Sequence, residues 1–381
     1  MKSLKSIIAT AACALACASV AQATVVVHFT GSTAYRGAFT NAILHSMTSG
    51  SAAWIGKDNT VALNGATTAI FRGLIGGTDT IIKTSFNGSV GGILTVTKNV
   101  ALNFLDTTAT PMAAVSIAAG NVITGGTYIG TAGTYEVVAP EVAMSDVYQG
   151  STAYKTPTLT TDKIVGIVPF QWVVSADGTN SISNMTPQLA QSQWGGFGTL
   201  PLSLYTGNPA DSVTTVYATG RDNDSGTRLT AFAESGVGVA SSIQQYDPST
   251  GNPYPAQTLY GIDFMDVGQG GESSGGTLAG KMGAHSGTIY VSYFSTGDAT
   301  TAAGVGAKKL TYNGFAYSAA AVAEGQYTFW GYEHLMYKTT DAGIKGAANK
   351  IADQLTTTDG TVLVGSMHVS RASDGGVVIN N

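Results

Sequence analysis

Apolar residues recur along the chain with two different periods, which predict strands and helices in turn. Thr24 to Phe29 is a short run rich in β-branched residues, and the segment after it places Phe39, Ile43, Leu44 and Met47 on one helical face. Small and hydroxyl-bearing residues separate the two patterns. The start of the chain therefore predicts a strand, a tight turn and a helix.

The same alternation continues to the C-terminus. Lys163 to Thr179 predicts a pair of strands, and the weakly alternating Gly/Ala/Thr-rich region from Thr107 to Thr134 predicts inserted hairpins. Strands that alternate with helices favour an α/β architecture with largely parallel sheets. Further segments with a strand or helix pattern are 81–96, 135–151, 185–196, 213–220, 224–235, 285–296, 327–338 and 340–356.

The N-terminal segment has the pattern of a cleaved export signal. A basic region, Met1 to Lys5, precedes the apolar Ser6 to Val20, and Ala21 to Ala23 fits a signal-peptidase site. We therefore expect residues 1–23 to be removed and the mature chain to begin at Thr24. Export leaves the periplasm or the cell surface as locations.

Both cysteines, Cys13 and Cys17, lie inside this segment, so the mature chain needs neither a disulfide nor a thiolate metal site. Lipidation of Cys17 is the alternative, but the position three residues before it is Ala14 and not the leucine that a lipoprotein signal normally carries there.

Charged residues make up only 11% of the chain, against roughly 25% in ordinary soluble domains, and 49 residues are glycine. The net charge is −5, and it becomes more negative once Lys2 and Lys5 are removed. Nucleic-acid binding is not expected, because it needs a basic face. No later run is long and apolar enough for a membrane span.

Four short turns rich in hydroxyl groups carry the candidate chemistry. Each can be read as a helix cap, since Ser, Thr and Asp accept from the first amides of a helix. The same unpaired amides can hold an oxyanion instead. The candidate ligand-binding residues on these turns are Ser32, Thr33, Ser89, Asp146, Arg221, Ser225, Gly226 and Thr227.

The order of these turns resembles that of the phosphate-binding proteins of bacterial ABC phosphate importers, within the type II periplasmic solute-binding superfamily. The resemblance rests on "GST" after the first strand, "GSVGG", "MSDVY" and "RDNDSGT". It implies two α/β lobes joined by two crossing strands, with residues 24–172 and 330–381 in lobe I and 173–329 in lobe II. It also implies a periplasmic protein that binds phosphate, performs no reaction, needs no cofactor or metal, and has a permease and its ATPase as partners.

The resemblance also implies a role for each turn. Arg221 would contact phosphate oxygens, the turn at Ser225 would offer amides and hydroxyls, and Ser32, Thr33 and Ser89 would donate from the other lobe. Asp146 would accept a proton-bearing oxygen and so select phosphate over sulfate.

The sequence departs from the family at two positions after the arginine, where Asn223 and Asp224 replace an aspartate and a glycine. Asp222 and Asp224 place two further carboxyls beside the arginine, and their negative charge would oppose an anion.

Other functions fit the sequence less well. A secreted surface or matrix protein that reuses the fold for adhesion is the main alternative, favoured by the low charge and the inserted region. The absence of a metal cluster from the sequence argues against a hydrolase of phosphate esters. The segment from Asp222 does not have the residue spacing of an EF-hand calcium loop. Gly275 to Met282 only approaches a P-loop and is expected to be a flexible loop. The histidines, which lack ligand spacing and are expected to be structural, are His28, His45, His285, His334 and His368.

Overall fold

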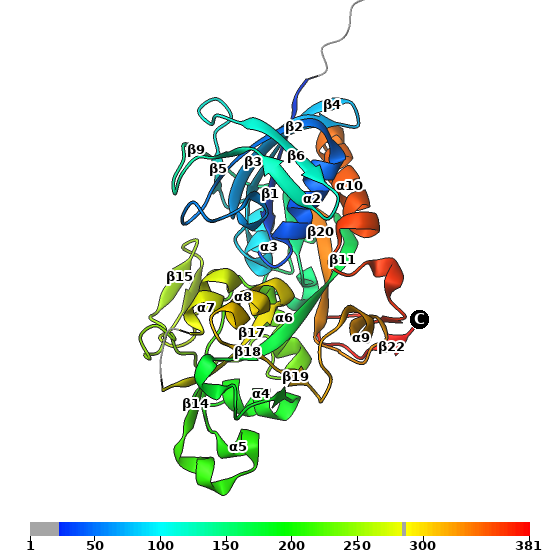
Figure 1. The fold of residues 1–381 in the computed structure, drawn as a ribbon. Coiled ribbons are helices and arrows are strands. Elements are labelled where there is room, and N and C mark those ends of the chain that lie inside the picture. The colour runs from blue at the N-terminus through cyan, green and yellow to red at the C-terminus, as the bar shows by residue number, and fades with distance from the viewer. Residues whose placement is uncertain (1–22, 284–286) are drawn as a thin grey trace, which may run out of the picture.

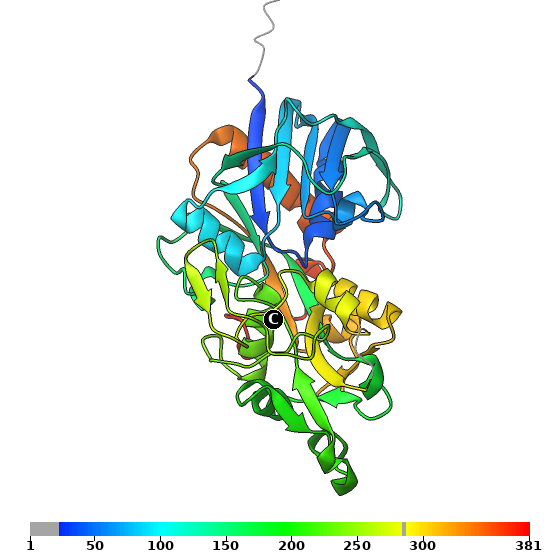
Figure 2. The same ribbon diagram turned by 90° about the vertical axis from the view of Figure 1, so that its left-hand side faces the viewer.

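The computed structural model describes residues 23–283 and 287–381 of the chain. They form an upper and a lower half, which share one sheet of 14 strands (Figure 1). Strands β11 (Thr161–Val174) and β20 (Trp330–Tyr337) pair antiparallel and run from one half into the other, as Figure 2 shows from the side. The predicted signal segment, apart from Ala23, lies outside the described residues.

The upper half holds most of the sheet, and the lower half holds the shorter strands beyond β11. Upper strands of the sheet are β1 (Val25–Gly31), β2 (Met47–Ile55), β3 (Thr68–Ile75), β4 (Thr78–Ser85), β6 (Ala113–Ala118), β7 (Val122–Gly125), β8 (Thr127–Tyr128) and β10 (Val142–Ser145). Lower strands of the sheet are β13 (Thr199–Pro201), β14 (Thr215–Ala218), β17 (Ile289–Ser295) and β18 (Lys308–Lys309).

Four two-stranded sheets and nine α-helices complete the described part of the chain. The small sheets pair β5 (Leu102–Leu105) with β9 (Tyr135–Val138), β12 (Asn184–Met185) with β19 (Thr311–Tyr312), β15 (Gln257–Leu259) with β16 (Asp263–Met265), and β21 (Val369–Ser370) with β22 (Ile379–Asn380). The helices are α2 (Arg36–Ser46), α3 (Ser89–Lys98), α4 (Pro187–Trp194), α5 (Ser203–Thr206), α6 (Gly226–Ser235), α7 (Gly275–Lys281), α8 (Thr296–Gly304), α9 (Ala319–Ala323) and α10 (Ala342–Gln354).

Helices cover both faces of the upper sheet. Val142 and Met144 of β10 face the core that α2 and α10 build, whereas Ala143 between them packs with Ile93 and Val96 of α3. This alternation follows from the period of two in a strand. Strand β1 lies between β4 and β10 and is parallel to both, so the carboxyl ends of all three strands meet at one edge of the sheet.

The α/β fold with two crossing strands agrees with the sequence prediction, but three expectations were wrong. The sheet is mixed rather than largely parallel, because β11, β20 and β17 pair antiparallel. Residues 163–179 form one long strand, β11, followed by a short 3-10 turn, and not a strand pair. Residues 275–281 form helix α7, capped by Ser274, and not a flexible loop.

The inserted region from Thr107 to Thr134 contains the predicted hairpin. Strands β6 and β7 pair antiparallel, and β6 adds to the sheet along β2. The lobe boundaries at Trp172 and Trp330 stay a prediction. Within the part of the chain that the structure describes, none of the helices combines the length and apolar character needed to cross a membrane.

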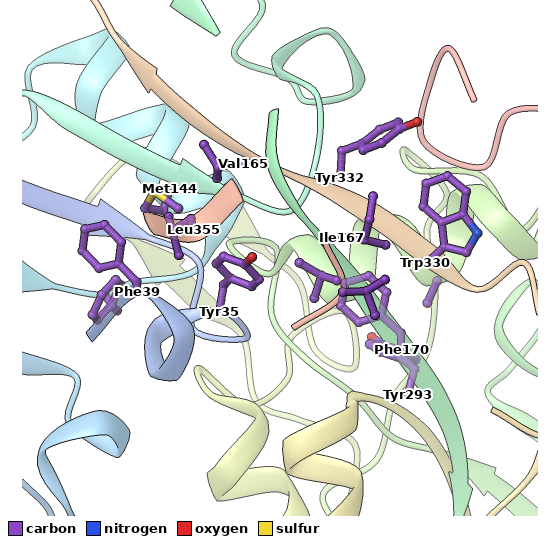
Figure 3. Close-up of a cluster of buried hydrophobic side chains, with 14 of the residues drawn as sticks. Tyr35, Phe39, Met144, Val165, Ile167, Phe170, Tyr293, Trp330, Tyr332 and Leu355 are labelled. Carbon is purple, nitrogen blue, oxygen red and sulfur yellow. The ribbon is translucent and has the colours of Figure 1, made fainter. Parts of the chain in front are cut away.

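The core passes without a break from the upper to the lower half. In Figure 3, Tyr35 lies between Phe39 and Met144 on one side and Ile167 and Phe170 on the other. Aromatic rings continue this core into the lower half around Trp172. The crossing strands therefore contribute side chains to a core that both halves share.

Trp172 is the centre of the aromatic packing in the lower half. Its ring is stacked on Phe329 at a centroid distance of 5.0 Å and meets the edge of Tyr293 at 5.9 Å. We expect Trp172→Ala to lower the free energy of unfolding by about 3–5 kcal/mol, because it leaves a large cavity. Chemical denaturation measures this loss. The exposed Phe197→Ala is the control and should change stability by less than about 0.5 kcal/mol; equal effects of the two variants would contradict the prediction.

Candidate anion site between the two halves

Arg221 follows β14 and reaches from the lower half toward the upper one. Its side chain is only 2% exposed. Two backbone carbonyls orient the guanidinium: Nε donates to Glu272 O at 2.9 Å and Nη2 donates to Ser273 O at 2.7 Å. Nη2 also donates to Thr33 Oγ1, across the junction, at 3.4 Å. These three acceptors are neutral, so they orient the guanidinium without cancelling its positive charge.

Helix α6 begins at Gly226, five residues after the arginine. Ser225 is its N-cap and accepts from the amide of Arg228 at 3.2 Å. Arg228 fixes the turn in return, because its Nη1 donates to Arg221 O at 2.9 Å and to Gln269 O at 2.7 Å. Gly226 and Thr227 lie in the first turn, where amides have no acceptor within the helix. The turn therefore presents amide donors and a partial positive charge.

The upper half supplies three turns from the edge where β1, β4 and β10 end. Ser32 and Thr33 follow β1, Ser89 begins α3 after β4, and Asp146 follows β10. The parallel register of the three strands explains why these turns lie together. Ser32 is anchored through its amide to Met144 O at 2.8 Å, and Ser89 Oγ accepts from the amide of Asp146 at 3.2 Å.

The two sets of turns meet at Gly226. A Cβ atom at Gly226 would lie 1.5 Å from Asp146 Oδ1 and 2.7 Å from Ser89 Cβ. Beside this contact, the amides of Val90 and Gly91 donate to Asp224 O at 2.9 and 3.2 Å. The structure therefore brings all four predicted turns, and the eight residues on them, to one place, while their role in ligand binding stays a prediction.

Burial raises the pKa values of the acidic residues at the candidate site. It raises the pKa of Asp146 to about 6, against the effects of the Ser89 hydroxyl and Arg221. It also raises the pKa of Asp222 to about 6, although Arg221 and Arg228 oppose the shift. Burial, with Asp222 and Asp263 nearby, raises the pKa of Asp224 to about 8. Near pH 7 Asp224 is therefore largely un-ionised, and it opposes an anion less than the sequence suggests.

Asn223 does not orient Arg221. It lines a cavity of about 570 Å³ beside the junction, together with Val90 and Tyr154 of the upper half and Ser225 of the lower half. The carbonyls of Glu272 and Ser273 take the orienting role instead. These two residues come from a distant loop, and nothing in their local sequence predicts the contact.

Two further charged side chains near the site were missed by sequence analysis. Arg36 begins α2, and its pKa is lowered by burial and by Arg221, while Asp298 of α8 acts in the opposite direction. Glu333 lies on β20 with no exposed surface. A signal for Glu333 was present, because an acidic residue within the aromatic and apolar run 327–337 is unusual for a buried strand.

The described histidines pair with carboxyl groups, as the expected structural role requires. His28 contacts Glu136 and Glu141, and the others each contact one acidic residue; His285 lies outside the described residues. The other pairs are His45 with Asp359, His334 with Asp162, and His368 with Glu324. Across residues 23–283 and 287–381, no group of three or more His, Cys, Asp or Glu side chains is arranged to hold a metal ion.

Several solved structures have a fold similar to that of this chain. A candidate phosphate ABC transporter substrate-binding protein with bound phosphate, from Clostridium perfringens, matches with a TM-score of 0.50 and 12% identity over 89% of this chain and 99% of that one. An ABC-type phosphate transport receptor from Vibrio cholerae matches with a TM-score of 0.46 and 12% identity, over 88% and 99% of the two chains. An OxyR mutant from Corynebacterium glutamicum matches with a TM-score of 0.39 and 8% identity, over 94% and 75%.

The fold is that of type II periplasmic-binding proteins, and this likeness concerns the fold alone. No protein-family model matches the sequence. No curated protein matches it either.

The close contact at Gly226 can be tested with one methyl group. We expect Gly226→Ala to lower the free energy of unfolding by about 1–3 kcal/mol, because Asp146 or the whole α6 turn must move to admit the Cβ atom. Thermal unfolding measures the loss. Gly280→Ala is the matched control, since Gly280 is an exposed helical position with nothing within 4 Å of an added Cβ. A Gly226→Ala protein as stable as this control would show that the contact does not constrain the fold.

Proposed function

We propose that this protein binds phosphate, or a similar oxyanion, at the junction of its two halves and performs no reaction on it. The observation that carries the proposal is the position of Arg221. Its guanidinium donates to Thr33 of the opposite half, at the place where the α6 turn, Ser89 and Asp146 meet. A guanidinium beside helix N-termini is the kind of group that holds a tetrahedral oxyanion.

The geometry gives the anion donors from both halves. Arg221 and the amides at the start of α6 belong to the lower half, and the hydroxyls of Ser32, Thr33 and Ser89 belong to the upper one. A ligand that contacts both sets stabilises the arrangement in which the halves meet. Binding and closure are then linked, which is what a transport receptor needs.

Asp146 is the residue proposed to set selectivity. Its side chain is buried and ionised near pH 7, because its pKa is about 6. A buried carboxylate repels a ligand oxygen unless that oxygen carries a hydrogen. Hydrogen phosphate brings such a hydrogen and sulfate does not, so we infer selection of phosphate over sulfate.

The biological role follows from this binding and from the N-terminal segment. We infer an exported, periplasmic protein that delivers phosphate to an ABC permease and its ATPase. An adhesion or matrix role that reuses the fold is the second candidate, and the β6–β7 hairpin added along β2 favours it because it extends the sheet edge. Isothermal titration of the mature protein with phosphate, arsenate and sulfate separates the two, since the second role predicts no heat with any anion.

The role of Arg221 is tested by Arg221→Ala. We expect the affinity for phosphate to fall at least about tenfold, because each hydrogen bond to a charged group contributes roughly 1.5–3 kcal/mol. Arg72→Ala is the control: it removes a surface arginine that pairs with Asp79, and it should leave phosphate binding unchanged. Equal affinities of the two variants, measured by titration calorimetry, would exclude Arg221 from the site.

The role of Asp146 is tested by Asp146→Asn. The amide can donate to a fully ionised oxygen, so we expect the ratio of phosphate to sulfate affinity to fall by about tenfold or more. Competition titrations with the two anions measure this ratio. Asp106→Asn is the control, since the half-buried Asp106 pairs with Thr108 in a surface turn. A variant that discriminates as well as the wild type would show that selectivity comes from another group.

A further inference from the structure

Glu333 is a carboxyl group that the fold buries without a positively charged partner among the described residues. It lies on β20 opposite Gly166 of β11, and its neighbour His334 pairs with Ser145 of β10. The residue has 0% exposure. Neither of its carboxyl oxygens makes a hydrogen bond of ordinary geometry with the described residues, and the Ser32 hydroxyl is the one donor that acts on its ionisation there. A buried carboxyl in this state is costly, so a missing partner is expected.

The neighbours of Glu333 belong to the candidate site. Asp146 and the Ser32 hydroxyl both act on its ionisation. Asp146 follows Ser145, which is in register with His334, so the two acids lie on adjacent strands. Oδ1 of Asp146 is also buried and has no hydrogen-bond partner in the described part of the chain. Two carboxyl groups with unused oxygens therefore lie beside one another at the same site.

We propose that Glu333 is a second carboxyl of the anion site. Its un-ionised form donates a hydrogen bond to an oxygen of the bound anion, while Asp146 accepts a hydrogen bond from a hydroxyl of the anion. This inference deepens the proposed function and rests on it. The exchange is balanced: Glu333 O–H points to an unprotonated ligand oxygen, and a ligand O–H points to Asp146. No proton is transferred.

The electrostatic surroundings favour this division of roles. Burial raises the pKa of Glu333 well above its usual range, and Asp146 adds to the shift, while the Ser32 hydroxyl opposes it. Two ionised carboxylates would repel an anion, whereas one un-ionised carboxyl is a donor.

Tyr35 is a further titratable group beside Glu333. The Tyr35 phenol, before α2, has its pKa raised by burial and by Glu333, with a smaller contribution from Asp359. On β11 the facing residue is Gly166, which has no side chain. Arg221, from across the junction, acts on Asp146.

The pair defines the chemistry of the ligand more narrowly than Asp146 alone. The ligand must offer both an oxygen that accepts and a hydroxyl that donates. Hydrogen phosphate and hydrogen arsenate satisfy both requirements, and sulfate lacks the hydroxyl. The affinity must also fall as the pH rises, because the form of Glu333 that binds is lost when the carboxyl ionises.

Titration calorimetry of the mature protein with inorganic phosphate from pH 6 to 9.5 tests the proposal. Glu333→Gln keeps a donor and cannot ionise, so its affinity at pH 7 should be within about threefold of the wild type. Above the pKa of Glu333 the wild type should weaken relative to this variant, by up to about tenfold for each pH unit. Glu333→Ala removes the donor and should bind at least about tenfold more weakly at pH 7. The ionisation of phosphate itself affects all the proteins equally.

Glu234→Gln is the matched control, because Glu234 is a buried glutamate that pairs with Arg371 away from the site. Its pH profile should follow the wild type, and thermal unfolding shows that each variant is folded. An Ala variant that binds like the wild type, or a Gln variant whose pH profile parallels it, would overturn the role of Glu333 and leave the proposed function standing. A wild type that binds no phosphate would overturn both.

Discussion

The two halves of this protein meet through backbone turns that leave no room for side chains. A Cβ atom at Gly88 would lie 2.3 Å from Asp224 O, and one at Gly226 would lie 1.5 Å from Asp146 Oδ1. Both glycines stand at helix N-termini, where the first amides have no acceptor inside the helix. Because the close approach brings two such termini together, the positive ends of α3 and α6 and the groups around them share one small volume. The candidate site is a consequence of this contact.

The charge balance at the site depends on which groups are buried with partners and which are not. Carbonyl oxygens of Glu272 and Ser273 orient Arg221, so its positive charge is not cancelled by those partners. Burial raises the pKa values of both Asp146 and Asp224, so that near pH 7 Asp224 is largely un-ionised while Asp146 keeps its charge. A chain with few charged residues can therefore place several acids beside one arginine, while burial lowers the negative charge that Asp224 carries near pH 7.

Much of this arrangement could be predicted from the sequence, because its signals are local. The turn at Ser89 and the start of α6 at Ser225 each follow a strand pattern and carry capping residues, which identify helix N-termini. The orienting carbonyls could not be predicted, since they come from a distant loop. The apolar run 327–337 marks Glu333 as an unusual acid, but its position beside Asp146 depends on the register of β20 against β10 and β11. The single strand β11 was taken for two because an apolar run does not show where pairing ends.

The two helices at the junction have different parts in this scheme. The amides of Val90 and Gly91 in α3 already donate to Asp224 O, so this terminus is used mainly to join the halves. In α6 the Ser225 hydroxyl satisfies the amide of Arg228, which leaves the first two amides of that helix without an acceptor inside it. An anion at the junction would therefore be held chiefly by α6 and Arg221, on the lower half. In the proposed site the upper half would contribute hydroxyls and carboxyls, which would recognise the hydrogen atoms of the ligand rather than its charge.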